Sequence, residues 1–542
     1  MYRVVEDKQE VGRNLRLMPI FAAIDIGSNS CRLAIASVER HELRTLHEDR
    51  EVTRLGESVF ESGVISPESM ANTIKALKRF HKAVQTHVVD KVRVVATSAT
   101  RDALNADAFH SWVQSATGWT LEVISGLEEG RLIHLGVMTH EPDAQGRCLL
   151  IDLGGGSCEV TLSDKGRIQE MMSLPLGAVR LQQEFLRADP PSKQDIGRLR
   201  QFIDREMSRV ETKLGKPKVD LVLATSGTAA ALAEAANALP AEGAVEKHAA
   251  KAARGKTAGA ASAPLQADTA SVRRLADRLA KMTNTQRAAV KGIGPRRSEI
   301  IVGGAQVYAT LLERTGLAGF RYSPLGLRDG VLAQMLADTD TRASVYKTME
   351  SERWQGVTEV CKRYGVDPAK SEPVRRQAEV LFDSLQRVHE LPAEYRLWLA
   401  AAAMMREVGK FMNHQGHHRH TQYIIANSEV FGFSQRQRTI VAAISRYLGK
   451  SRPEPMDRTM RSVPVEEHSN VKKAVVLLRL AQALHGERTG PPLRLKTLVY
   501  PKRVVLQLQP ARGSAELELW SLRKEGAYFR EVLRRELFID VA

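Results

Sequence analysis

The stretch CLLIDLGGGSCEVTL, residues 148–162, carries the clearest fold signal in the chain. An apolar run of strand length ends near Asp152, three glycines and Ser157 form a turn, and a second strand is expected over 159–162. Such a turn gathers backbone N–H groups and a hydroxyl around one point, next to an acid. This arrangement suits a phosphate group.

The same theme occurs twice more. FAAIDIGSNSCRLAIASV, residues 21–38, places Asp25 before a GSNS turn and returns as a hairpin. LVLATSGT, residues 221–228, leads directly into an Ala-rich helix. Because matched turns open two α/β segments, we predict an α/β fold with two duplicated lobes facing a cleft. One helix and two further strands are expected in the first lobe, over 66–84, 92–97 and 121–124.

Four carboxylates accompany these turns. Two adjacent acids lie in ISGLEEGR, residues 124–131, a pattern that alone is typical of a helix N-terminus. Hydrolysis of a phosphoanhydride needs a carboxylate to orient or deprotonate water and a cation to neutralise the phosphate oxygens. The candidates for these tasks are Asp25, Glu129, Asp152 and Glu159.

The 542 residues are too many for one core, so we expect two to four domains. The first lobe is expected over residues 1–145 and the second over 146–335. A flexible insertion is expected at 241–270, where Ala, Lys, Gly and Ser dominate.

The rest of the chain changes character. Helical periodicity predicts an all-α domain over 345–490. Alternating stretches at 504–508 and 517–519 predict a small β-containing domain over 491–542, with one helix around 527–534.

The composition indicates which kinds of binding partner and which cellular location to expect. A formal charge of +16 favours a polyanion, which includes nucleic acid, anionic lipid and polyphosphate, although the basic insertion supplies part of that charge. Four cysteines without CxxC spacing argue against a disulfide framework or a zinc site. Because the chain has neither a signal-peptide pattern nor an apolar run of about 20 residues, we expect a cytoplasmic protein with no membrane partner.

Eight motifs between residues 21 and 330 carry a specific resemblance. In chain order they are IDIGSNS, ATSATRDA, ISGLEEGR, IDLGGGSCE, LPLGAVR, TSGT, RRSEIIVGGA and SPLGLRDG. This series resembles the exopolyphosphatase and guanosine pentaphosphate phosphohydrolase family, within the actin, sugar kinase and heat-shock ATPase superfamily. The resemblance implies two RNase H-like lobes, a Mg²⁺-dependent phosphohydrolase and a homodimer.

The resemblance also implies roles for individual residues. Glu129 matches the carboxylate that activates water, and Asp152 and Glu159 match acids that support Mg²⁺ and the nucleophile. Asp25 is expected to join them as a metal ligand. Phosphate contacts are expected from three loops and one arginine, namely Gly27, Ser28, Asn29, Ser30, Arg101, Gly154, Gly155, Gly156, Ser157, Ser226, Gly227 and Thr228.

The helical part, from residue 374 to 490, resembles the family's appended domain, which is related to HD-type metal phosphohydrolases. Arg406 stands at the expected His of the His-Asp pair, and Gln482 stands at the expected final Asp. A cation and an amide are poor replacements for imidazole and carboxylate ligands. We therefore expect a degenerate metal site.

Four histidines, at positions 414, 417, 418 and 420, lie close together in this part. They have no cysteine partner and several basic neighbours, which favours an anion-facing patch over a zinc site. One hypothesis is that they guide long polyphosphate together with Arg406, Lys410 and Arg419.

Several function classes stay open from the sequence. Exopolyphosphatase activity accounts for the loops, the carboxylates and the positive charge. Guanosine pentaphosphate hydrolysis uses the same chemistry, and no guanine pocket is recognisable. A nucleotide-dependent kinase or ATP-driven switch is disfavoured by ISGLEEGR and LPLGAVR. A noncatalytic nucleic-acid binder is disfavoured because aromatic residues make up 5% of the chain and show no stacking cluster.

Overall fold

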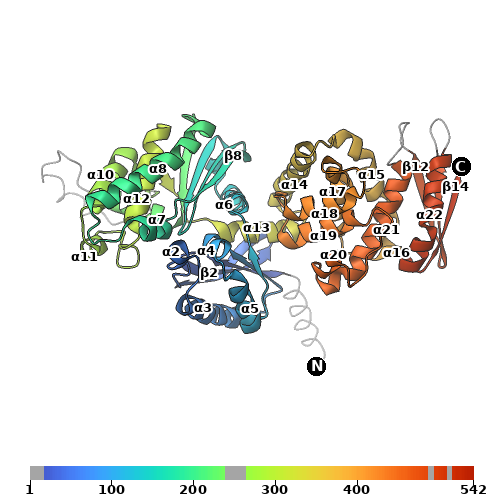
Figure 1. The fold of residues 1–542 in the computed structure, drawn as a ribbon, viewed down its shortest axis with the longest axis horizontal. Coiled ribbons are helices and arrows are strands. Elements are labelled where there is room, and N and C mark those ends of the chain that lie inside the picture. The colour runs from blue at the N-terminus through green and yellow to red at the C-terminus, as the bar shows by residue number, and fades with distance from the viewer. Residues whose placement is uncertain (1–17, 239–263, 486–492, 510–514, 542) are drawn as a thin grey trace, which may run out of the picture. The chain divides into compact units, whose positions relative to one another are not determined.

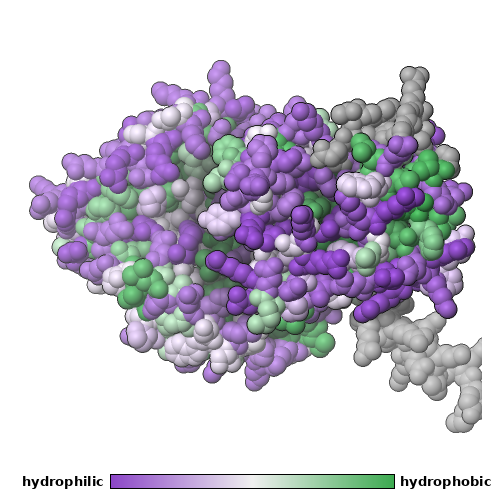
Figure 2. All heavy atoms as spheres, turned by 45° about the vertical axis from the view of Figure 1, so that its right-hand side comes forward, coloured by the Kyte–Doolittle hydropathy of each residue, from purple (hydrophilic) through white to green (hydrophobic). Residues whose placement is uncertain are grey.

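The computed structural model describes residues 18–238, 264–485, 493–509 and 515–541. The chain forms two compact units, Met1–Tyr346 and Lys347–Ala542 (Figure 1). Each unit has its own hydrophobic core, which in the N-terminal unit consists of one cluster in each lobe. In the described ranges no helix is both long and apolar enough to cross a bilayer. The face drawn in Figure 2 is mostly hydrophilic, with apolar side chains in scattered groups.

The first lobe of the N-terminal unit contains a five-stranded sheet in the order β3-β2-β1-β4-β5. β1 to β3 form antiparallel pairs, whereas β4 and β5 extend the sheet parallel to β1. The predicted hairpin and the predicted helix are present. The elements are β1 (Ile20–Ile26), β2 (Ser30–Glu39), β3 (Glu42–Val52), β4 (Lys91–Ala96), β5 (Leu121–Val123), α2 (Val59–Ser62), α3 (Pro67–Thr86), α4 (Ser98–Asp102) and α5 (Ala106–Thr117).

The second lobe repeats this topology. Its six-stranded sheet has the order β10-β11-β9-β6-β7-β8, so β8-β7-β6-β9-β11 corresponds to the whole first sheet. Again two antiparallel pairs are followed by parallel strands. The predicted duplicated RNase H-like lobes are therefore confirmed. The strands are β6 (Cys148–Leu153), β7 (Cys158–Asp164), β8 (Arg167–Leu174), β9 (Leu221–Thr225), β10 (Gln266–Asp268) and β11 (Gly319–Tyr322).

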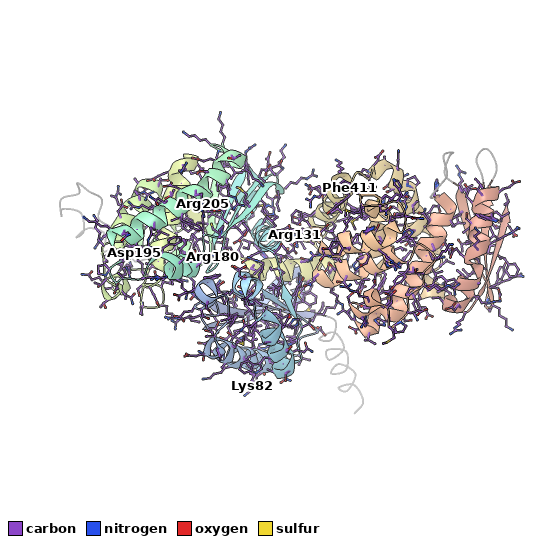
Figure 3. All side chains as sticks on the ribbon, viewed as in Figure 1. Lys82, Arg131, Arg180, Asp195, Arg205 and Phe411 are labelled. Carbon is purple, nitrogen blue, oxygen red and sulfur yellow. The ribbon has the colours of Figure 1, made fainter. Side chains whose placement is uncertain are left out.

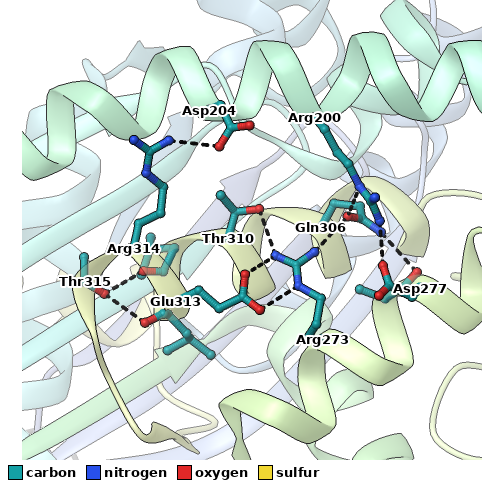
Figure 4. A network of polar contacts seen from close by, with 12 residues as sticks. Arg200, Asp204, Arg273, Asp277, Gln306, Thr310, Glu313, Arg314 and Thr315 are labelled. Atoms are coloured by element: carbon teal, nitrogen blue, oxygen red, sulfur yellow. Dashed lines mark hydrogen bonds and ion pairs between the residues drawn. The ribbon is translucent and has the colours of Figure 1, made fainter.

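Helices of the second lobe are joined by a polar network (Figure 4). Arg273 donates from Nε to Glu313 at 2.7 Å, and Arg200 donates to Gln306 at 3.0 Å. The helices are α7 (Ala178–Phe185), α8 (Lys193–Leu214), α9 (Ser226–Ala238), α10 (Thr269–Leu279), α11 (Asn284–Ala288) and α12 (Ile301–Thr315). The two arginine contacts hold α8, α10 and α12 together within the lobe.

α6 (Gly126–His140) follows the first sheet in the chain but packs on β7 and β8 of the second, whereas α13 (Leu327–Thr339) follows the second sheet but packs on β1 and β2 of the first. The two helices cross at glycines. A Cβ on Gly330 would lie 1.7 Å from the carbonyl oxygen of Leu132, and a Cβ on Gly136 would lie 2.6 Å from the amide nitrogen of Gly330. Because α13 packs on α6, β1 and β2, the expected lobe boundary at residue 335 falls inside a helix of the first lobe and is wrong.

The expected flexible insertion needs one correction. Residues 239–263 lie outside the described residues. The last residues of the expected insertion, 241–270, do not belong to a flexible segment. Gln266–Asp268 forms β10, which pairs with β11 in the sheet. The backbone hydrogen bonds of an edge strand override the loop-like composition of this segment.

The C-terminal unit combines helices with a three-stranded sheet, β12-β13-β14, around one core. The helical domain and the small β-containing domain therefore form one body. Its longer elements are α14 (Ser344–Arg363), α15 (Pro368–Ser384), α17 (Tyr395–Met405), α18 (His417–Asn427), α19 (Gln435–Arg446), α21 (His468–His485), α22 (Glu516–Leu533), β12 (Arg494–Val499), β13 (Arg503–Gln509) and β14 (Glu536–Val541). Short helical turns are α16 (Gln386–His389), α20 (Arg458–Arg461), η2 (Val408–Phe411) and η3 (Val465–Glu467).

One sequence interpretation in the tail is wrong. The alternation at 517–519 is part of α22 and is not a strand. The buried positions Glu518, Leu522, Phe529 and Leu533 have helical spacing. Three residues are too few to distinguish a period of two from one of 3.6.

The predicted degenerate metal positions do meet in this unit. Arg406 Nε donates to Gln482 Oε1 at 2.7 Å, which joins the segment after α17 to α21. Only 3% of the Arg406 surface is exposed, so the hypothesis that this arginine guides polyphosphate is wrong. Two of the predicted histidines lie against each other, with 3.9 Å between the ring centroids of His417 and His418 and the ring planes tilted by 47°.

Candidate active site

The first predicted phosphate loop is a tight turn between β1 and β2. Gly27 N donates to Ser30 O at 3.2 Å, and Ser28 Oγ accepts from Ala99 N of α4 at 3.2 Å. The turn is thus held at the end of the strand that carries Asp25.

The second loop, between β6 and β7, has the same internal bond. Gly154 N donates to Ser157 O at 3.0 Å. Ala178 N and Val179 N, in the first turn of α7, donate to the carbonyls of Gly154 and Gly155 at 3.0 and 2.8 Å. Because N–H and C=O point in opposite directions across a trans peptide, the amides that follow these carbonyls point away from α7. The loop therefore turns donors toward the cleft that it lines.

The third predicted phosphate loop is the first turn of α9, which follows β9 directly. Ser226 Oγ donates to Leu153 O at 2.6 Å, which ties this loop to the second one. A Cβ on Gly227 would lie 1.7 Å from Nη2 of Arg297, so the guanidinium lies directly against the loop. Ser226, Gly227 and Thr228 all line the cleft.

Three of the predicted acids lie together where α6 packs on the second sheet. Glu129 lies in the first turn of α6, while Asp152 and Glu159 are cross-strand partners on β6 and β7. Carboxylate oxygens of the three residues all lie within 4.8 Å of one another. Asp25, on β1, lines the same cleft.

Burial and mutual repulsion govern the charge of this cluster. Burial, followed by the charge of Glu159, raises the pKa of Glu129 well above its ordinary value. Burial and then Asp152 raise the pKa of Glu159 to about 8, although Ser173 donates to it at 2.7 Å. Each acid thus makes ionisation of its neighbour more costly.

For the two strand-end aspartates, Asp25 and Asp152, burial raises the pKa while neighbouring groups lower it. Burial raises the pKa of Asp25 to about 6, and the charges of Arg32 and Arg328 oppose this rise. Burial also raises the pKa of Asp152, which accepts a hydrogen bond from Thr225 Oγ1.

The donor set fits a hard divalent cation. Glu129 Oε2 and Glu159 Oε2 are buried and have no hydrogen-bond partner. Carboxylate oxygens are the ligands that Mg²⁺ prefers, and a cation here would offset the repulsion among the acids. Within the described ranges, this cluster with Asp152 is the one set of His, Cys, Asp or Glu side chains close enough to share a metal ion. The histidines of 414–420 do not form such a set.

The cleft has a volume of about 550 Å³ and is lined by both lobes. It contains the predicted loops and also four arginines that sequence reasoning missed, Arg32, Arg50, Arg297 and Arg328. Burial, followed by the charges of Arg32 and Arg297, lowers the pKa of Arg50 to about 10. A concentrated positive wall therefore faces the acidic cluster.

Arg101 is placed differently from the expectation. It is not among the residues that line the cleft. Its Nη1 donates to Ile124 O at 2.8 Å and lies 3.9 Å from Glu129 Oε2. In this structure Arg101 faces an acid, whereas the sequence led us to expect a phosphate contact.

Comparison with known proteins agrees with these observations. A sequence model of the Ppx/GppA phosphatase family matches residues 34–339, and one of Ppx/GppA phosphatase domain III matches residues 353–525. The chain is 32% identical over 326 residues to a Mycobacterium tuberculosis protein named Exopolyphosphatase 2, covering 57% of this chain and 96% of the relative.

Two further relatives are similar over the same part. Exopolyphosphatase 1 of Mycobacterium leprae is 30% identical, covering 62% of this chain and 95% of the relative. The crystal structure of an exopolyphosphatase from Cytophaga hutchinsonii aligns with a TM-score of 0.52 at 25% identity, covering 59% of this chain and 99% of that one.

Proposed function

The chain belongs to the Ppx/GppA phosphatase family, and we propose that it is an exopolyphosphatase, which hydrolyses the terminal phosphate of inorganic polyphosphate with Mg²⁺. One observation carries the proposal. The carboxylates of Glu129, Asp152 and Glu159 converge within 4.8 Å at a cleft that is also lined by Asp25 and by three glycine-containing segments. Relatives named exopolyphosphatases support the choice of substrate.

In the proposed reaction the loops bind the terminal phosphoryl group. Amide donors of Gly155 and Gly156, with the Ser157 and Thr228 side chains beside them, surround its oxygens. These groups orient the phosphorus and exclude bulk water, which is the main protein contribution in phosphoryl transfer.

Glu129 is the proposed general base. Its buried Oε2 has no hydrogen-bond partner and can take a proton from an attacking water. The raised pKa makes this carboxylate a stronger base than an exposed glutamate. Asp25, Asp152 and Glu159 would hold Mg²⁺, whose role when bound is to neutralise charge on the phosphate oxygens.

The arginine wall supports a linear polyanion. Arg32, Arg50 and Arg297 lie along the cleft, where phosphates behind the terminal one could pair with guanidinium groups. This part of binding is expected to weaken as salt increases.

Guanosine pentaphosphate is the alternative substrate, because it presents the same terminal anhydride. Tyr322 is the aromatic side chain among the lining residues against which a guanine base could stack. A homodimer and a cytoplasmic location stay predictions from the sequence.

Phosphate release from long polyphosphate and from guanosine pentaphosphate, measured in parallel with Mg²⁺, tests the proposal. Glu129→Gln keeps the shape but cannot act as a base, so we expect activity to fall by roughly 10²-fold or more. Glu206→Gln is the control, because Glu206 is also buried but lies on α8 and pairs with Arg209. Failure of the wild type to release phosphate from polyphosphate, or full activity of Glu129→Gln, would refute it.

A further inference from the structure

Arg180 connects the two lobes beside the phosphate loops (Figure 3). It lies on α7 of the second lobe, and its Nε donates to the carbonyl of Gly156 at 2.9 Å. Its Nη2 donates to Ser98 Oγ of α4 in the first lobe at 3.2 Å and forms an ion pair with Asp102 on the same helix. One guanidinium therefore binds the second loop and the opposite lobe together.

The first loop is reached through the same helix. Ala99 N, next to Ser98 on α4, donates to Ser28 Oγ of the first loop. Contacts are thus continuous from the second loop through Arg180 and α4 to the first loop.

The two loops also approach each other closely. A Cβ on Gly155 would lie 3.0 Å from Ser28 Cβ, and one on Gly156 would lie 2.4 Å from Ser98 Oγ. The second loop therefore packs directly on the first loop at Ser28 and on α4 at Ser98, so a small shift of α4 would move both contacts. The amides of α7 bind the carbonyls of Gly154 and Gly155, and the Arg180 side chain binds the next carbonyl, that of Gly156.

The surroundings of Arg180 distinguish its ion pair with Asp102 from the more exposed ion pair between Arg187 and Glu61. Its guanidinium carbon lies 4.0 Å from the centroid of the Phe60 ring, and its side chain is 15% exposed. Glu184, on the next turn of α7, lies 3.6 Å from Nη1. By contrast, the pair of Arg187 and Glu61 has a 4.0 Å separation, with side chains 73% and 67% exposed. Exposed pairs of that kind contribute little.

We propose that Arg180 is a positioning residue that, clamped to Asp102 and Ser98, sets the spacing of the two phosphate loops for hydrolysis. This role rests on the proposed function of the cleft, and Arg180 itself need not touch substrate. A misplacement of about 1 Å in a reacting group can reduce the rate by roughly 10²-fold. Loss of the clamp is therefore expected to lower kcat.

The kinetic test uses Arg180→Met, which keeps the apolar stem over Phe60, together with Asp102→Asn and the double variant. For phosphate release from polyphosphate we expect kcat to fall by about 10- to 100-fold in Arg180→Met, with KM changed less than threefold. The double variant is expected to match Arg180→Met, because Asp102 acts through Arg180. Arg187→Met, the exposed control between the same lobes, is expected to keep kcat within twofold.

Hydrogen exchange without substrate gives an independent readout. In Arg180→Met we expect faster amide exchange in peptides covering 96–103 and 154–160, but not in a peptide covering 301–315 of α12. Unchanged amide exchange in 96–103 of Arg180→Met, or a rise in KM with kcat intact, would refute the proposal that Arg180 positions the two loops. If the wild type releases no phosphate while both segments still loosen, the clamp stands and the proposed substrate fails.

Discussion

Glu129 on α6 and Glu159 on β7 bring their carboxylate oxygens within 4.8 Å of each other. Each has one buried oxygen without a hydrogen-bond partner. The proximity arises because α6 packs directly on β7 and β8 of the second sheet. The electrostatic character of the site therefore depends on how α6 is seated on that sheet.

The first prediction concerns pH and stability in the absence of metal. The pKa of Glu159 is about 8 in the folded protein, against an ordinary 4.5. Because the native state holds the proton more tightly, the stabilisation is complete below pH about 4.5 and is lost as pH rises toward 8. Each pH unit between these two pKa values corresponds to about 1.4 kcal/mol of unfolding free energy, so the expected loss of stability is large. Glu159→Gln is expected to flatten the dependence.

Thermal unfolding at pH 5, 7 and 9, with EDTA and with Mg²⁺, measures this effect. Mg²⁺ is expected to raise the Tm of the wild type most at pH 9, and less in Glu159→Gln. An equal pH slope in wild type and Glu159→Gln would contradict the prediction. Glu206→Gln again serves as a buried control away from the cleft.

The second prediction concerns Gly227. In Gly227→Ala the new Cβ would lie 1.7 Å from Arg297 Nη2, so the guanidinium must move. Losing a charge-assisted contact of about 1.5–3 kcal/mol should reduce kcat/KM for polyphosphate by roughly 10- to 100-fold. Gly197→Ala is the control, because a Cβ there meets nothing within 4 Å. Wild-type kinetics in Gly227→Ala would show that Arg297 does not serve the substrate.

The third prediction concerns the salt bridge under Glu129. Arg131 is fully buried and binds Glu128 through two bonds of 2.8 Å, and Gln334 of α13 through one of 2.7 Å (Figure 3). Arg131→Met leaves a buried carboxylate without this partner, so urea unfolding should reveal a loss of about 3–5 kcal/mol.

The pair of Arg198 and Asp195 has the same spacing of three residues, and its arginine side chain is 54% exposed, so it provides the matched control. Arg198→Met is expected to change stability by less than about 1 kcal/mol. Equal effects of the two substitutions would argue against a special contribution of the buried pair.

The fourth prediction concerns the degenerate metal position. Arg406→Met removes the donor to Gln482 Oε1 within a buried part of the C-terminal unit. We expect a destabilisation of about 1–3 kcal/mol in urea, with no recovery on adding Zn²⁺ or Mn²⁺. Arg419→Met, at an exposed position of α18, is expected to be neutral. Recovery of stability with metal would indicate that ligands persist there.

The duplicated sheets were predictable because each lobe repeats an apolar strand, an acid and a glycine turn. Asp25 and Asp152 mark these repeats, and their strands do occupy equivalent positions in the two sheets. The acids Asp25, Glu129, Asp152 and Glu159 were candidates from the residues alone, but the role of Glu129 as the base was implied by the family resemblance. An acid at a helix N-terminus has no local feature that reveals its partners on other elements.

The arginine wall could not be read from the sequence for a similar reason. Arg32 and Arg50 face the cleft from β2 and β3, but a single arginine in a strand resembles any surface arginine. β3 itself was not expected, because its burial pattern is mostly exposed and its residues are largely charged. The membership of α13 in the first lobe depends on its contacts with β1 and β2, which local sequence patterns do not reveal.

The glycine crossing of α6 and α13 limits how the lobes can separate. Sliding one helix along the other would drive the backbone at Gly330 into that at Leu132, whereas turning about the contact leaves their separation unchanged. Any opening of the cleft would therefore proceed as a rotation about this crossing, which would carry the loops of the two lobes apart.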